Sequence, residues 1–317
     1  MNQKIQTILD EVTRVIKGKD EVVAKVMMAV LARGNVLLED VPGVGKTTMA
    51  LSFAKAMGLK TRRVQFTPDT MPSDIIGFSV YDKDTGALSY KEGAIMTNLL
   101  LADEINRTSS KTQAALLEAM EEKRVTVDGV TYDLPEPFIV LATENPAGSA
   151  GTQMLPNSQL DRFLIKLSIG YPDLASQTEI LMARHTEDPL SKVEQVVSEE
   201  ELKDLIEEAN QVYMAESLYN YVARLVQKTR EHAMVSLGIS PRGALALCRM
   251  TKAHALCEDR DYVVPEDIRA VFADVCAHRL MLNSKARLNE YTPESILEEI
   301  LSEVPMPQTD DFKSLLK

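Results

Sequence analysis

Residues 36–57 decide the fold, and they read Val36-Leu37-Leu38-Glu39, then Asp40-Val41-Pro42-Gly43-Val44-Gly45-Lys46-Thr47-Thr48, then Met49-Ala50-Leu51-Ser52-Phe53-Ala54-Lys55-Ala56-Met57. The first part predicts a strand, the second a glycine-containing turn and the third a helix. This order builds a cradle for phosphate groups, because backbone N–H groups line the turn and the positive end of the helix dipole faces the anion. Lys46 can reach the β- and γ-phosphates of a nucleotide, and the Thr47 hydroxyl can ligate Mg²⁺. The predicted phosphate-binding residues are Val41, Pro42, Gly43, Val44, Gly45, Lys46, Thr47 and Thr48.

Asp40 departs from the usual pattern G-x-x-x-x-G-K-[ST], which has glycine at its first position. A carboxylate that points at a triphosphate is unfavourable, so we expect Asp40 to face away from the ligand. The alternative interpretation of the segment is a chance glycine turn.

Composition limits the class of protein. Of the 317 residues, 45% are hydrophobic and 26% are charged. No run approaches the roughly 18 consecutive apolar residues of a membrane span, and the first 15 residues lack an apolar core of the signal-peptide kind. We therefore expect a cytoplasmic protein without a membrane span. Lys and Arg number 35 against 47 Asp and Glu, and the net charge of −12 disfavours binding to nucleic acid.

The first half of the chain alternates between strand-like and helix-like segments. Apolar strand-like runs, several of them continuous as in a buried parallel sheet, are 36–38, 63–66, 99–102, 138–142 and 164–168, and helices are expected at 47–57 and 112–122. That alternation predicts an α/β core with a mainly parallel sheet. Two β-hairpins, 78–90 and 125–132, interrupt it, and Asp128-Gly129 is a strong two-residue turn signal in the second.

Beyond residue 172 the sequence predicts only helices, as expected for a smaller all-helical lid domain. We divide the chain into an N-terminal amphipathic helix (1–17), an α/β core (18–186), a helical lid (187–285) and a C-terminal tail (286–317). The residues from about 303 onward are polar and contain proline, which predicts poor order.

Polar side chains follow two of the predicted strands. Asp103, at the end of the run Leu99-Leu100-Leu101-Ala102, is placed to bind Mg²⁺, and Glu104 to polarise an attacking water. Asn145 ends another strand and could bind the γ-phosphate or the same water. Helix capping by the acids and an Asx turn at Asn145 are the alternatives.

Two arginines occur at positions suited to a phosphoryl group. Arg162 precedes a strand and could reach a nucleotide on an adjacent subunit, or it could pair with a local acid. Arg242 begins a lid helix and could sense the γ-phosphate, or it could be an ordinary surface residue.

These elements occur in an order that resembles the AAA+ ATPases. The strings Leu101-Ala102-Asp103-Glu104-Ile105-Asn106-Arg107, Gln113-Ala114-Ala115-Leu116-Leu117-Glu118-Ala119-Met120, Ala142-Thr143-Glu144-Asn145-Pro146 and Gln159-Leu160-Asp161-Arg162-Phe163 are similar to the MoxR family, as is Ser240-Pro241-Arg242. The resemblance implies a P-loop NTPase core of AAA+ type with two inserted hairpins and a helical lid. It also implies that Lys46 and Thr47 belong to Walker A, Asp103 and Glu104 to Walker B, Asn145 to sensor 1, Arg162 to the arginine finger and Arg242 to sensor 2. Arg107 is a further candidate for contact across a subunit boundary.

The resemblance also implies activity and partners. Members of the family are ATP- and Mg²⁺-dependent, chaperone-like motors that form rings, commonly hexamers. They mature or assemble protein complexes or insert metal cofactors, often beside a partner with a von Willebrand factor A (VWA) domain. Two other functions stay open: a motor subunit of a metal chelatase or a nucleic-acid machine, and a nucleotide-gated scaffold with negligible hydrolysis.

Overall fold

The core of the molecule is a five-stranded parallel sheet. The computed structural model describes residues 2–41, 43–83, 86–145, 152–184 and 188–307. The sheet has the strand order β2-β5-β8-β1-β9, and its strands are β1 (Val36–Glu39), β2 (Thr61–Gln65), β5 (Leu99–Asp103), β8 (Ile139–Glu144) and β9 (Ile165–Leu167). The predicted parallel sheet is confirmed. Its carboxyl ends meet at one edge, because Leu101 of β5 pairs with Leu141 of β8, and Leu141 with Val36 of β1.

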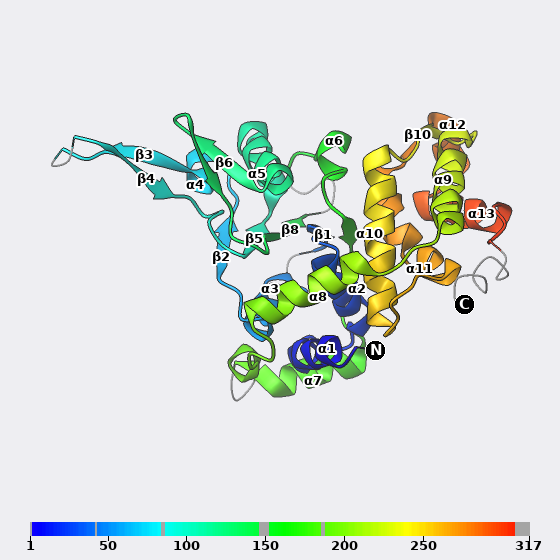
Figure 1. The fold of residues 1–317 in the computed structure, drawn as a ribbon, viewed down its shortest axis with the longest axis horizontal. Coiled ribbons are helices and arrows are strands. Elements are labelled where there is room, and N and C mark those ends of the chain that lie inside the picture. Colours follow the sequence, from blue (N-terminus) through cyan, green and yellow to red (C-terminus); the bar gives the residue numbers. More distant parts are fainter. Residues whose placement is uncertain (1, 42, 84–85, 146–151, 185–187, 308–317) are drawn as a thin grey trace.

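Helices cover both faces of the sheet (Figure 1). Leu99 and Leu101 of β5 belong to the hydrophobic cluster that includes α1 (Gln3–Val15), α2 (Asp20–Leu31) and α3 (Lys46–Ala56). Leu100 and Ala102 belong to a second cluster, which includes α5 (Ser110–Glu122). Side chains alternate between the two faces of a strand, so a continuously apolar strand is what a sheet covered on both sides requires.

The two predicted hairpins are confirmed. They are β3 (Gly77–Tyr81) with β4 (Leu88–Glu92) and β6 (Arg124–Val127) with β7 (Val130–Asp133), and the first extends away from the sheet in Figure 1. Positive φ angles at Asp128 (50°) and Gly129 (83°) form the second turn. The rings of Tyr90 and Tyr132 stack with centroids 4.0 Å apart and so join the hairpins.

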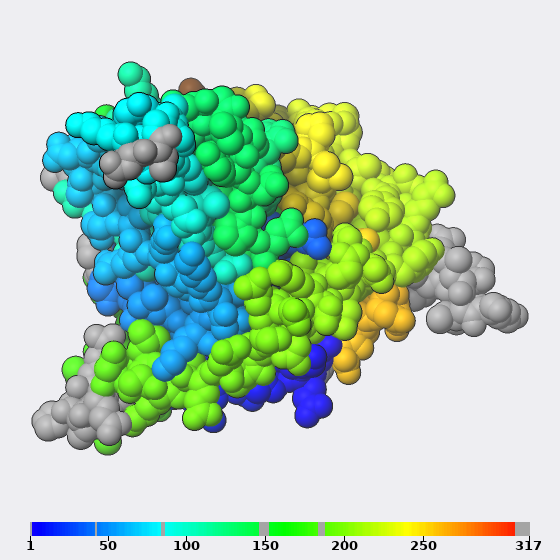
Figure 2. Space-filling model, turned by 60° about the vertical axis from the view of Figure 1, so that its left-hand side comes forward, coloured from blue at the N-terminus to red at the C-terminus, as the bar shows by residue number. Residues whose placement is uncertain are grey.

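The second half of the chain is mainly helical. The remaining helices and 3₁₀ turns are α4 (Pro72–Ile76), η1 (Ile105–Arg107), α6 (Asn157–Leu160), α7 (Leu174–Arg184), η2 (Pro189–Lys192), α8 (Glu199–Gln211), α9 (Glu216–Glu231), α10 (Pro241–Cys257), α11 (Pro265–Cys276), η3 (Ala277–Arg279), α12 (Ser284–Leu288) and α13 (Pro293–Glu303). In Figure 2 the yellow-green segment that contains α8 runs from the blue and green core to the yellow lid. One hydrophobic cluster includes residues of α2, α8 and α10, and it therefore ties the lid to the core.

The structure differs from the sequence-based expectation in two places within the second half. A short antiparallel pair, β10 (Val235–Leu237) with β11 (Met281–Leu282), lies among the helices, and strands this short leave no periodic signal. The segment assigned to a tail contains α13, which is anchored because Ile296, Leu297 and Ile300 are buried. None of the helices in the described part of the chain is both long and apolar enough to cross a membrane.

Candidate functional site

The phosphate cradle predicted around Lys46 is formed as a loop between β1 and α3. Gly45 stands at the N-cap of α3 with φ 97°, a conformation that favours glycine. No side chain caps this end of the helix, so its first N–H groups are available to an anion. Pro42, one of the predicted phosphate-binding residues, lies outside the described residues.

Asp40 faces away from the cradle, as predicted. One carboxylate oxygen accepts hydrogen bonds from the Gly170 N–H and the Ser168 hydroxyl, and the other accepts from the Val41 N–H at 2.8 Å. Its backbone carbonyl accepts a bond of 2.6 Å from the Lys46 ammonium. Burial lowers the pKa of Lys46, although nearby carboxylates oppose the shift. The ammonium is thus buried at the loop and held by a neutral acceptor.

Asp103 ends β5 opposite Thr47. Its Oδ2 lies 3.5 Å from the Thr47 hydroxyl oxygen, and its Oδ1 accepts a 3.3 Å bond from the Thr143 hydroxyl. Carboxylate and hydroxyl oxygens are ligands that suit Mg²⁺, so this pair fits the ion. The Arg63 guanidinium also donates to Asp103 Oδ2, at 2.7 Å. A cation at this oxygen therefore competes with Arg63.

Glu104 has a strained backbone. Its φ of 57° and ψ of 48° are left-handed, which costs a non-glycine residue about 1–3 kcal/mol and is common at functional sites. The Glu104 N–H donates to the Thr143 hydroxyl at 2.9 Å, which holds this conformation. Its carboxylate pairs with Arg107 at 2.8 Å. That hydrogen bond is the main cause of a lowered pKa, and a bond from Asn145 adds to it. Glu104 is therefore ionised at neutral pH.

Asn145 is buried at the end of β8 beside Glu104. Its N–H donates to Asn106 Oδ1 at 3.3 Å, and its carbonyl accepts from Asn106 Nδ2 at 3.0 Å. The two strand ends are thus clamped together by one side-chain amide, which fixes Asn145 relative to Glu104.

The fold brings the predicted acids and the phosphate loop together in one cavity of about 310 Å³. It is lined by Gly43, Gly45, Lys46, Thr47, Thr48, Arg63, Gln65, Asp103, Glu104 and Thr143. These residues follow the strands or lie in their last two positions at the carboxyl edge of the sheet, apart from Arg63, which lies two residues before the end of β2. Arg107, a further candidate for contact across a subunit boundary, pairs with Glu104 of its own chain in this single copy.

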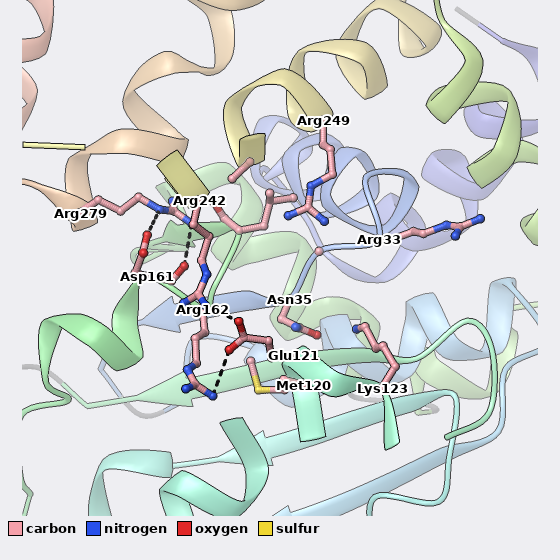
Figure 3. Close-up of a pocket in the computed structure, with 13 residues that line it drawn as sticks. Arg33, Asn35, Met120, Glu121, Lys123, Asp161, Arg162, Arg242, Arg249 and Arg279 are labelled. Atoms are coloured by element: carbon pink, nitrogen blue, oxygen red, sulfur yellow. Dashed lines mark hydrogen bonds and ion pairs between the residues drawn. The ribbon is translucent and has the colours of Figure 1, made fainter. Parts of the chain in front are cut away.

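Arg162 and Arg242 lie in a different cavity, of about 220 Å³. Both guanidiniums contact one carboxylate, that of Glu121 on α5 (Figure 3): Arg162 at 3.3 Å and Arg242 in a shorter ion pair. Arg162 precedes β9, and residues 33–35 before β1 also line the cavity. It therefore lies at the amino edge of the parallel sheet, opposite the phosphate loop.

A buried arginine fixes both of these arginines in place. Arg279, at the end of η3, donates to the Asp161 carboxylate at 2.8 Å and to the carbonyls of Phe163 and Leu164. Asp161 also accepts a 3.0 Å bond from the hydroxyl of Ser240, the N-cap of α10. The segment with Arg162 and the helix that starts with Arg242 are thus joined through Asp161.

Several residues of the two cavities were not identified from the sequence. Asn106 carried a usable signal, since it lies within the same motif as Asp103 and Glu104. Thr143 likewise lies within the string that contains Asn145, whereas Arg63, Glu121 and Arg279 carried no such signal, because their contacts depend on the tertiary arrangement. The Arg242–Glu121 pair, for example, joins residues 121 positions apart.

Comparisons with known proteins agree with this geometry. The model of the ATPase family associated with various cellular activities (AAA) matches residues 35–165, and that of the AAA lid domain matches residues 227–300. The chain is 46% identical to uncharacterized protein YeaC of Bacillus subtilis, over 94% of this chain and 93% of that protein. It is 38% identical to Chaperone MoxR1 of Mycobacterium tuberculosis, over 96% of this chain and 83% of the relative. A crystal structure of a candidate ATPase from Cytophaga hutchinsonii matches with a TM-score of 0.88 and 38% identity, over 96% of this chain and 95% of that one.

Proposed function

Because the chain belongs to the MoxR family of AAA+ ATPases, we propose that it hydrolyses ATP at the junction between copies in a ring and uses the energy to remodel protein complexes. One observation carries the proposal. The phosphate loop and the acids form one cavity at the carboxyl edge of the sheet, whereas Arg162 and Arg242 share a carboxylate at the amino edge.

Four residues of the carboxyl-edge cavity, with Asn145 beside them, have a chemical role in this proposal. The α3 N-terminus and Lys46 bind the β- and γ-phosphates, and Thr47 with Asp103 holds Mg²⁺, which offsets charge on the phosphoryl group. Glu104, whose pKa the hydrogen bond from Arg107 lowers, orients and polarises the attacking water as a carboxylate. Asn145 positions that carboxylate and its water.

The arginines act on a neighbour's nucleotide rather than on their own. The four residues of β1 separate the two edges of the sheet by about 13 Å, at about 3.3 Å per residue. A head-to-tail contact places the amino edge of one copy against the carboxyl edge of the next, and such contacts form a ring when the rotation between copies closes. Arg162 and Arg242, joined through Glu121, then approach the neighbour's terminal phosphate as a pair.

The finer parts of the proposal come from the family. We propose a hexameric, cytoplasmic ring that acts with a VWA-domain partner on a protein client, with metal-cofactor insertion as one form of that work. The relative named Chaperone MoxR1 supports the chaperone part. The net charge of −12 does not favour a nucleic-acid substrate.

The proposal is tested by measuring ATP binding and phosphate release on the same preparations. Glu104→Gln should bind ATP but release phosphate about 10²–10⁴-fold more slowly, the usual contribution of a general base. Lys46→Ala should lose ATP binding. Glu118→Gln, a change on α5 outside both cavities, is the matched control. ATP binding without phosphate release by the unmodified protein would favour a nucleotide-gated scaffold and contradict the proposal.

A further inference from the structure

The cavity at the amino edge is strongly cationic. Among the described residues, its lining includes six cationic side chains and two carboxylates: Arg33, Lys123, Arg162, Arg242, Arg249 and Arg279, with Glu121 and Asp161. Like charges gathered in one cavity repel one another unless counter-ions separate them. The cations without an acidic partner therefore leave positive charge in the cavity unbalanced.

Four of the cations are paired with acids. Glu121 binds Arg162 and Arg242, and Asp161 binds Arg279. Arg33 pairs with Glu207 of α8 at 3.2 Å. The two acids that line the cavity thus form ion pairs with three arginines. The acid that pairs with Arg33 does not line the cavity.

Arg249 and Lys123 have no carboxylate partner among the described residues. Lys123 donates to the Phe138 carbonyl at 3.2 Å and lies over the Phe138 ring. Burial, followed by the positive charges of Arg249 and Arg33, lowers the pKa of Lys123 to about 8, while Glu136 opposes the shift. The two uncompensated cations are thus close enough to affect each other.

Their geometry leaves room for a ligand. Arg242, Ala246 and Arg249 line the cavity at i, i+4 and i+7 of α10, hence on one face of the helix. The short side chain of Ala246 leaves space between the two arginines. Figure 3 shows the guanidinium of Arg249 directed into the cavity from above and Lys123 rising from the opposite wall. Arg249 is also exposed, so that an anion can enter from solvent.

We propose that Arg249 and Lys123 form an anion subsite for a phosphate-type oxyanion, next to the guanidinium pair of Arg162 and Arg242. A tetrahedral oxyanion accepts charge-assisted hydrogen bonds from an ammonium and a guanidinium at once. The source of the oxyanion is either inorganic phosphate in solution or a phosphoryl group of a nucleotide on a neighbouring copy. The subsite does not depend on the proposed ATPase activity, because it is present in a single copy without nucleotide.

The test follows the ionisation of Lys123 itself. Lysines of the dilute full-length protein are dimethylated, which keeps their charge, and their ¹³C resonances are followed by NMR against pH. Comparison with Lys123→Arg assigns the resonance. The account expects a pKa of about 8 without phosphate and a rise of about one pH unit with inorganic phosphate, relative to sodium chloride at equal ionic strength.

Substitutions at Arg249 then separate the subsite from a general salt effect. Arg249→Gln should raise the pKa of Lys123 in the absence of phosphate, because a like charge is lost. It should also raise the phosphate concentration needed for the pKa response on the order of tenfold. Arg249→Lys should restore part of both properties. Arg224→Gln, which removes an exposed charge from α9 outside the cavity, should change neither.

A second arm distinguishes the two sources of the oxyanion. The same resonance is followed in Glu104→Gln protein assembled with ATP. A response to inorganic phosphate on dilute protein supports a free-anion subsite, and a response only in the assembly supports a phosphoryl group of the neighbour. A Lys123 pKa that is insensitive to both, or that Arg249→Gln leaves unchanged, overturns the proposal.

Discussion

The two edges of the central sheet differ in charge and in how they are built. At the carboxyl edge, Asp103, Glu104 and Asn145 directly end or follow buried strands, and hydrogen bonds with the side chains of Thr143 and Asn106 hold them. At the amino edge, Arg162 and Arg242 are brought together from separate segments of the chain by one carboxylate. One edge holds the phosphate loop and the acids, and the other holds the paired arginines. In the proposed function, each edge supplies half of a phosphoryl-transfer site, and the two halves lie at opposite edges of the sheet within one copy.

The contacts at the amino edge also differ among themselves in strength. Glu121 and its two arginines are partly exposed, and exposed ion pairs contribute about 0–1 kcal/mol each. Arg279 is buried and contacts several acceptors at once. Arg162 and Arg242 can therefore leave Glu121 for a phosphate at little cost in free energy. Arg279, which is held by several acceptors, stays in place.

The largest effect should follow from Arg162→Ala. Loss of an arginine finger lowers the rate of phosphoryl transfer roughly 10³–10⁵-fold, and the ATP affinity of the isolated copy should change little because its phosphate loop is intact. Phosphate release and calorimetric ATP binding check this together. Arg124→Ala, which removes a surface arginine paired with Glu122, serves as the control. Loss of ATP affinity of the isolated copy would place Arg162 on its own nucleotide and remove the contrast between the edges.

A smaller but substantial effect is expected from Arg279→Met. The substitution leaves Asp161 without its guanidinium partner and frees the carbonyls of Phe163 and Leu164. Breaking such a buried pair should lower the free energy of unfolding by about 3 kcal/mol, as measured by urea denaturation. Arg269→Met, which loses one carbonyl contact to α13, provides a comparison on the neighbouring helix. Equal decreases in the free energy of unfolding of both variants would show that the contacts of Arg279 with Asp161 contribute no more than the single carbonyl contact of Arg269.

Glu121→Gln should improve half-saturation by ATP modestly, whereas the two substitutions above cause losses. It removes the charge that competes with a phosphate for Arg162 and Arg242, so half-saturation by ATP should fall to about one fifth, as expected for about 1 kcal/mol. Steady-state phosphate release against ATP concentration measures it. Glu122→Gln, one position along the same helix and paired with Arg124, should leave the value unchanged. A lower kcat with unchanged half-saturation would instead make Glu121 a required support for the pair.

Arg107→Ala should change the pH dependence more than the rate at neutral pH. The bond from Arg107 holds the pKa of Glu104 below its usual value, so the active carboxylate form persists as pH falls until that lowered pKa is reached. Without Arg107, the pKa rises and the acid limb of kcat/KM moves to higher pH. Initial rates of phosphate release at ATP concentrations well below KM, in a series of buffers, measure this limb. If the acid limb of kcat/KM does not move, Glu104 is not the base whose ionisation sets that limb.

The carboxyl edge could be predicted from the sequence, because its residues directly follow strands and the parallel sheet brings strand ends together. Gly45, Lys46, Asp103 and Glu104 needed only local pattern and spacing. The amino edge could be predicted only in part. Arg162 and Arg242 were identified as candidates from their local sequence and given their roles by resemblance, but Glu121, Arg249 and Arg279 gain their importance from contacts between segments that no local pattern relates. The helix α13 was missed for the same reason, since its buried face is defined by what it packs against.

Mixing two inactive variants tests the central claim most directly. Lys46→Ala copies lack a bound triphosphate but keep the arginines, and Arg162→Ala copies bind ATP but lack the finger. If each site is shared between neighbours, an equimolar mixture under subunit exchange should recover about a quarter of the unmodified phosphate-release rate, the share of junctions that join two intact halves. A mixture that stays at the level of the separate variants would contradict the account.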